Sequence, residues 1–194
     1  MSRRMNFVMA AALFACAAGT PVRGEADHVG VYFDESALSS CASPMPLTTV
    51  NAYVVYSEPS VAEIIGYDFG IAVYQAFPQF YAPPPVQATT SACPATIPNL
   101  AQVSVRCSEP IPCGAHTTLL TLSLFWTRGL VYLDLTAAEA PLLPIAGPYV
   151  VLPDGSGMPF SNSRALAIID GGFDVCEGLP TESWTWGAVK GLYR

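Results

Sequence analysis

Two histidines, and the cysteines near one of them, have the widest chemical repertoire in this sequence. His116 follows Cys113 with the C-x-x-H spacing that a zinc site allows, and Cys107 precedes both. A structural zinc site needs four ligands, and this motif supplies three. His28 stands in no such motif. We therefore interpret both histidines as structural residues and expect no metal or cofactor site.

Other catalytic chemistry has little support in the sequence. The G-x-S-x-G pattern of a serine nucleophile elbow is absent. Several carboxylates stand near glycines, but their spacing does not match an acid-rich calcium loop, so we interpret them as turn residues. These acids are Asp154, Asp170, Asp174 and Glu177. We predict no catalytic residue. A carboxylate-dependent hydrolase acting on carbohydrate remains the alternative, because strand-borne acid pairs leave no motif.

The chain contains six cysteines, and disulfides are their default use in an exported protein. Cys107 and Cys113 flank the segment Ser-Glu-Pro-Ile-Pro between two predicted strands. We predict a Cys107–Cys113 disulfide and prefer it to a zinc site. The pairing among Cys41, Cys93 and Cys176 stays open, and an odd count leaves one cysteine free or intermolecular.

The first 26 residues have the features of a signal peptide. A pair of arginines precedes an apolar run at residues 7–18, which is too short to span a bilayer comfortably. Cleavage after Gly24 or Ala26 fits the small-residue rule, and we prefer Ala26. A lipoprotein box ending at Cys16 is the alternative, although a bulky residue within the box disfavours it. We expect a secreted, periplasmic or cell-surface protein.

The composition excludes some classes of partner. Removal of residues 1–26 takes away three arginines and one glutamate, which leaves five cations, fourteen acids and a net charge of −9. A nucleic-acid partner would need a basic face, and an anionic membrane would also select for cations. We therefore expect no nucleic-acid partner and no membrane association after signal cleavage.

The stretch 117–136 has the strongest structural pattern. Apolar and mostly polar residues alternate on both sides of Arg128-Gly129, which is typical of strands with one buried face. We interpret it as a hairpin with a two-residue loop; a three-residue loop with Gly129 in the left-handed region is the rival geometry. The hairpin would place Trp126 opposite Val131, Leu124 opposite Leu133, and Leu122 opposite Leu135.

The rest of the chain predicts an all-β fold. Short β-branched and aromatic runs are separated by turn signals, and Gly66 and Gly70 indicate a bulge or bend inside one strand. The proline-rich stretch Phe77–Pro98 is incompatible with a central strand. We predict an antiparallel β-sandwich of about seven to eight strands over residues 27–178, with an open β-barrel as the alternative. A signal helix would precede it, and a short helical tail at 179–194 would follow.

Both ends of the chain resemble a recurrent group of small secreted bacterial proteins. The opening is DHVGVYFDESALSSC, and the ending PTESWTWGAVKGLYR contains the pattern W-G-x-x-K-x-L-Y. This resemblance implies an exported β-sandwich with a cysteine soon after its first strand, and implies no activity. The chain departs from the pattern at Gly171, where a cysteine often stands.

The function predicted from the sequence is an exported, non-enzymatic domain with a structural, adhesive or ligand-binding role. The tail either packs on the sandwich or is an exposed segment that binds a cell-surface or extracellular protein. Its aromatic and basic content motivates the second hypothesis, and the ending shared with the group that the chain resembles favours it. The candidate interaction residues are Trp184, Trp186, Lys190, Leu192 and Tyr193.

Overall fold

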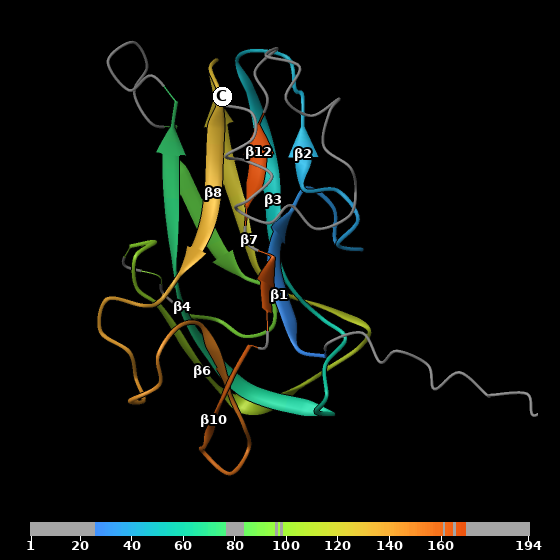
Figure 1. Ribbon diagram of the computed structural model, residues 1–194, viewed down its shortest axis with the longest axis vertical. Helices are drawn as coiled ribbons and strands as arrows, with labels where there is room; N and C mark the ends of the chain where they lie inside the picture. Colours follow the sequence, from blue (N-terminus) through green and yellow to red (C-terminus); the bar gives the residue numbers. More distant parts are fainter. Residues whose placement is uncertain are drawn as a thin grey trace, which may run out of the picture.

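The fold consists of two β-sheets that enclose one apolar core (Figure 1). The computed structural model describes residues 26–76, 84–95, 97, 99–160, 162–164 and 166–169. Within these residues every regular element is a strand, and no helix there could cross a membrane. The predicted β-sandwich is therefore confirmed, while the signal segment and the tail lie outside the described residues.

The two sheets differ in size. In order across the first, five-stranded sheet lie β11 (Asn162–Arg164), β1 (His28–Tyr32), β3 (Thr48–Ser57), β7 (His116–Trp126) and β5 (Val86–Thr90). The second, seven-stranded sheet contains β10 (Gly157–Pro159), β9 (Tyr149–Val151), β4 (Glu63–Gln75), β8 (Val131–Thr136), β12 (Ala167–Ile169) and β2 (Cys41–Ala42), and β6 (Val103–Pro112) pairs with β4. Most pairs are antiparallel; β1–β11 and β2–β12 are parallel. The described residues thus hold more strands than we predicted, because several have only two or three residues.

The predicted hairpin is wrong in its pairing, although its alternation is right. β7 lies between β3 and β5, whereas β8 lies between β4 and β12 in the other sheet. Leu124 is opposite Val50 and Val86, not Leu133, yet both leucines are fully buried in the same core. Alternation identifies the buried face of a strand but not its neighbour. Here the chain changes sheets after Trp126, so the two apolar faces meet across the core.

Gly129 and Gly66 stand at positions where the backbone favours glycine, the first for its positive φ and the second for a close backbone contact. Gly129 has a φ of 89°, the left-handed conformation expected of it, and its carbonyl accepts a hydrogen bond from the Trp126 indole at 3.0 Å. The predicted bulge is confirmed in β4, where the register with β6 shifts between Ile64 and Gly66. A Cβ at Gly66 would lie 2.3 Å from the carbonyl oxygen of Val105, so only glycine fits without a shift.

A buried carboxylate ties the segment before β9 to the second sheet. Asp68 is fully buried in β4 and accepts on both oxygens: Ser104 Oγ donates at 2.8 Å, the Leu142 N–H at 2.6 Å and the Tyr149 hydroxyl at 2.5 Å. The same hydroxyl accepts from the Leu143 N–H at 2.7 Å. Both carboxylate oxygens thus accept hydrogen bonds, and a carboxylate can be buried only when its oxygens are paired with donors.

The predicted Cys107–Cys113 disulfide is wrong. Cys107 is bonded to Cys93, with the two Cα atoms 5.8 Å apart, and Cys113 is a free, partly buried thiol. Cys41 is also disulfide-bonded. β6 runs antiparallel to β4, with Arg106 opposite Gly66 and the Cys113 N–H donating to the Ala62 carbonyl at 2.8 Å, so Cys107 and Cys113 are separated by roughly 10–13 Å along β4 at about 3.3 Å per residue. A disulfide needs its Cα atoms within about 7 Å.

Candidate functional site

The structure excludes the sequence-derived zinc motif. Cys107 is consumed by its disulfide, and burial, together with the negative charges of Asp27 and Glu63, raises the pKa of the Cys113 thiol. A zinc ligand must be a thiolate, so this environment opposes metal binding. No cluster of three histidine, cysteine or acidic side chains suited to a metal occurs within the described part of the chain.

The two histidines lie in one row across three strands. His28 in β1 and His116 in β7 are both directly opposite Ser57 of β3. The Nδ1 atom of His116 is 3.3 Å from the Ser57 hydroxyl. Ser57 is buried, and among the described residues no carboxylate orients His116. A hydrolytic triad needs an accessible nucleophile and such an acid, so we interpret this row as structural.

The carboxylates of Asp154 and Asp34 accept hydrogen bonds within turns. Asp154 accepts from the Ser156 N–H at 2.8 Å and from its hydroxyl at 2.6 Å, and these bonds hold the pKa of Asp154 below its usual value. Asp34 closes the turn after β1 through Ser36 Oγ and the Leu38 and Ser39 N–H groups. The other acids considered, Asp170, Asp174 and Glu177, lie outside the described residues, as do Trp184, Trp186, Lys190, Leu192 and Tyr193.

Asp27 anchors the start of the described chain. Its carboxylate accepts from the Tyr56 hydroxyl and from the Ser60 N–H, while its own N–H donates to the Glu58 carbonyl at 2.9 Å. Burial alone would raise the pKa of Asp27, but the hydrogen bonds outweigh burial and the pKa lies below its usual value. Burial and the same carboxylate raise the pKa of Tyr56. This is a structural lock and not a catalytic pair.

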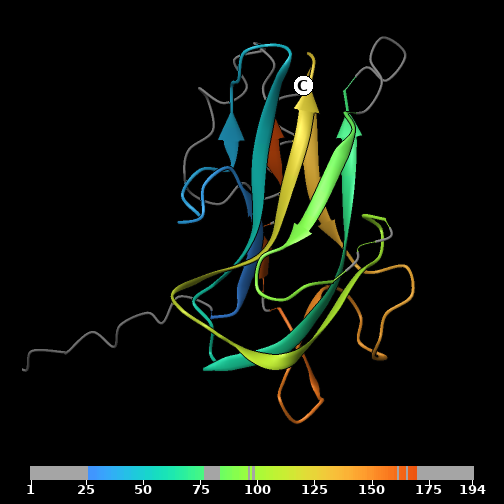
Figure 2. The same cartoon turned by 180° about the vertical axis from the view of Figure 1, so that it is seen from behind.

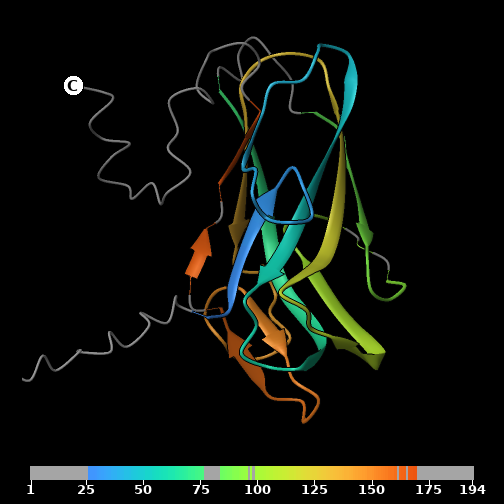
Figure 3. The same cartoon turned by 90° about the vertical axis from the view of Figure 1, so that its right-hand side faces the viewer.

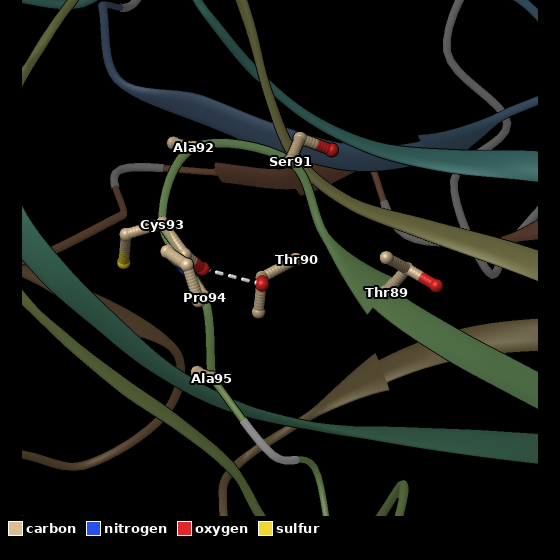
Figure 4. Close-up of a pocket in the computed structure, with 7 residues that line it drawn as sticks. All are labelled: Thr89, Thr90, Ser91, Ala92, Cys93, Pro94 and Ala95. Carbon is tan, nitrogen blue, oxygen red and sulfur yellow. Dashed lines mark hydrogen bonds between the residues drawn. The ribbon is translucent and has the colours of Figure 1, made fainter.

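A shallow hollow of about 540 Å³ lies at the end of β5 (Figure 4). The described part of its wall is one segment, residues 89–95, in which the Thr90 hydroxyl donates to the Cys93 carbonyl. The adjoining Cys93–Cys107 disulfide ties this segment to β6. Among the described residues, those that line the hollow include no charged residue and no histidine. They offer hydroxyl and backbone groups.

The hollow adjoins a flat surface on the outside of the five-stranded sheet. In Figure 2, β3, β7 and β5 lie side by side towards the viewer. Residues that are directly opposite one another point to the same side, and the alternate residues fill the core. The outward rows are Thr49 with Phe125, then Asn51, Ser123 and Gln87, then Tyr53, Thr121 and Thr89. We call these eight residues the neutral face.

The neutral face combines uncharged polar groups with one exposed aromatic ring. It contains no acid and no basic residue, in a chain whose formal net charge is −7. The Phe125 side chain is 45% exposed, one residue before the end of β7. Ser123 Oγ donates to Asn51 Oδ1 at 2.7 Å, so the amide nitrogen of Asn51 is left to donate outward.

The dimensions of the neutral face limit its ligands. Three strands about 4.8 Å apart and five residues at about 3.3 Å each define an area of roughly 10 by 13 Å between Cα positions. With the side chains included it covers on the order of 300 Å², whereas a stable protein interface uses about 800 Å² on each partner. A small or linear ligand fits this face, and a globular protein would have to extend well beyond it.

Sequence reasoning found only part of this face. The alternation of 117–127 separated Thr121, Ser123 and Phe125 from the core residues. The hairpin interpretation implied that Phe125 is opposite Tyr132, Ser123 opposite Asp134 and Thr121 opposite Thr136. In the structure these three residues are instead opposite residues of β3, and two of them also face β5. The one available signal was the absence of charge from Phe69 to Val105, which covers β5.

Comparisons with known proteins give fold-level likenesses only. No protein-family model matches the sequence, and no curated protein matches it. Among solved structures, a type II cohesin domain from the cellulosome of Acetivibrio cellulolyticus is 11% identical with a TM-score of 0.43, and covers 75% of this chain and 95% of its own. CaCohA2 from Clostridium acetobutylicum is 15% identical with a TM-score of 0.38, and the match covers 75% of this chain and 90% of CaCohA2. With TM-scores below 0.5, neither likeness carries an argument about function.

Proposed function

We propose that this protein is an exported, non-enzymatic binding domain that holds a neutral polysaccharide on its neutral face. The observation that carries this proposal is the charge-free group of hydroxyl and amide side chains around the exposed Phe125 ring. The signal-peptide features of residues 1–26 support export. The enzymatic alternative gains no support from Asp27, Asp68 and Asp154, because hydrogen bonds to neighbouring residues hold all three carboxylates in structural roles.

The chemistry of the face matches that of an uncharged sugar chain. Sugar hydroxyls both donate and accept, as do the hydroxyls of Thr49, Thr121 and Ser123 and the amide of Gln87. The C–H face of a sugar ring is apolar and can cover the ring of Phe125. An ionic ligand would leave its charge unpaired here, because no side chain of opposite sign is available on the face.

The expected contribution of Phe125 follows from its exposure. A phenylalanine can bury about 200 Å², so the exposed 45% corresponds to about 90 Å². Full cover by a ligand would contribute about 2 kcal/mol at about 25 cal/mol per Å². We therefore expect Phe125→Ala to weaken binding by roughly ten- to thirtyfold.

The test is binding of the purified protein to a panel of neutral glucans, mannans, xylan and chitin, with alginate as a charged chain. We expect retention by at least one neutral polysaccharide, little change with added salt, and loss of retention in Phe125→Ala and Asn51→Ala. Tyr74→Ala is the matched control, since Tyr74 is 53% exposed on the other sheet. Melting temperatures would show that the variants are folded. Absence of binding to every neutral chain, or undiminished binding by both face variants, would refute the proposal.

A further inference from the structure

The strand β5 presents an open edge at the end of the five-stranded sheet. It pairs with β7 along one side and is the last strand in that sheet's order, among the residues that the structure describes. In Figure 3 it is the green arrow on the right-hand side, and no described strand follows it in the order of that sheet. An open edge displays unpaired backbone groups that can template another strand.

The hydrogen-bond pattern identifies which backbone groups face outward. The Phe125 N–H donates to the Pro85 carbonyl at 3.2 Å, and the Ser91 N–H donates to the Leu119 carbonyl at 3.2 Å. In an antiparallel ladder, alternate residues bond to the same neighbour, so positions 85, 87, 89 and 91 turn their backbone groups towards β7. The N–H and C=O groups of Val86, Ala88 and Thr90 therefore point to the open side.

This edge lacks the features that usually prevent association. Natural edges are protected by charged side chains, by internal prolines or by bulges. β5 has the sequence VQATT, without a charge or an internal proline, and it pairs with β7 without a register shift. Prolines flank it at positions 84, 85 and 94 but do not interrupt it. The whole stretch from Phe69 to Val105 is free of charge in an otherwise acidic chain.

We propose that β5 pairs with β5 of a second copy of this protein, antiparallel and centred on Ala88. Like-charge repulsion between two acidic molecules is weakest where neither carries a charge, so this edge is the favoured place for two copies to meet. The pairing places Val86 opposite Thr90 of the other copy, and Ala88 opposite its counterpart. All three outward-facing residues of each copy then form ladder pairs, which no shifted register achieves. The resulting twofold symmetry is the commonest form of oligomer.

The pairing has a consequence for binding that rests on the proposed function. A twofold axis between antiparallel strands is perpendicular to the sheet, so the neutral faces of both copies lie on the same side of one continuous sheet. A linear polysaccharide could then contact both faces at once, and the second contact would be intramolecular. The dimer itself does not depend on this ligand, and its test uses the protein alone.

The test is a pair of matched double variants followed by sedimentation velocity over a wide range of protein concentration. In the proposed register Gln87 is opposite Thr89 of the other copy. Gln87→Lys with Thr89→Lys therefore creates two like-charge pairs across the axis, whereas Gln87→Lys with Thr89→Glu creates two opposite-charge pairs. At low salt we expect the wild-type protein and the Lys/Glu variant to dimerise. We expect the Lys/Lys variant to dimerise at least tenfold more weakly.

The design separates the proposed pairing from its rivals. Both double variants change the same exposed positions, and matching melting temperatures would show that both are folded. A wild-type protein that stays monomeric at every concentration would overturn the proposal. Equal dimerisation of the two double variants would also overturn it, because the dimer would then use another surface or register. A wild-type protein that dimerises but binds no neutral polysaccharide would count against the neutral face alone.

Discussion

Removal of one hydroxyl from the buried network around Asp68 should destabilise this protein without creating a cavity. In Tyr149→Phe the ring stays in place, and Asp68 loses the donor at 2.5 Å while keeping Ser104 and Leu142. The Leu143 N–H loses its acceptor at 2.7 Å as well. Burial and the Asp68 carboxylate raise the pKa of Tyr149 to about 12, so the hydroxyl is a donor throughout the working pH range.

The size of the effect follows from the bonds lost. A hydrogen bond to a charged group contributes about 1.5–3 kcal/mol. The Leu143 N–H lies in a partly buried segment where water can replace the hydroxyl, so its loss adds at most about 1 kcal/mol. We expect the free energy of unfolding to fall by about 2–4 kcal/mol. For a chain of this size the melting temperature would fall by roughly 5–15 °C.

Urea denaturation of the purified wild-type and variant proteins measures this change, with Tyr74→Phe as the control. Tyr74 is 53% exposed, and removal of its hydroxyl should change the free energy of unfolding by less than about 0.5 kcal/mol. If Tyr149→Phe changed stability as little as the control does, the argument that Asp68 depends on this donor would fail. If Tyr149→Phe caused a large loss of stability and Ser104→Ala caused none, the loss would be assigned to the Leu143 contact and not to the hydrogen bond with Asp68.

Three further predictions concern the core, the disulfide and the acid turns. Leu124→Ala should lower the free energy of unfolding by about 2–5 kcal/mol, because the side chain is fully buried; an exposed leucine would lose far less on denaturation. Unreduced peptide mapping should recover Cys93 linked to Cys107, and replacing both with serine should cost about 3 kcal/mol for a closed loop of this length; a peptide linking Cys107 to Cys113 would contradict the structure. Burial alone would raise the pKa of Asp34, but hydrogen bonds from Ser36, Leu38 and Ser39 lower it below its usual value, so its stabilisation is present above the unfolded pKa of about 3.9 and is lost as the pH falls through the folded pKa. Asp34→Asn should therefore flatten the acid side of the stability profile, and an unchanged profile would refute this assignment.

The composition and local pattern of the sequence determined the fold class and the buried side of the two strands within residues 117–136. Period-two alternation separates Leu124 and Leu133 from Ser123 and Asp134 because successive side chains in a strand point to opposite faces. The bulge at Gly66 was also predictable, since glycine inside a strand pattern permits a close approach of backbones. These properties depend on residues near one another in the chain.

Only the tertiary structure decided which strands are neighbours, which cysteines pair and which polar residues share a surface. β7 lies between β3 and β5, so Ser123 meets Asn51 and Gln87 instead of the residues just beyond the turn. Cys107 bonds to Cys93, which follows β5 in the chain, whereas Cys113, just beyond the end of β6, is a free thiol. The physical reason is the same in each case: a strand buries one face equally well against several partners. The choice among them depends on packing between distant segments, which alternation along a single strand does not encode.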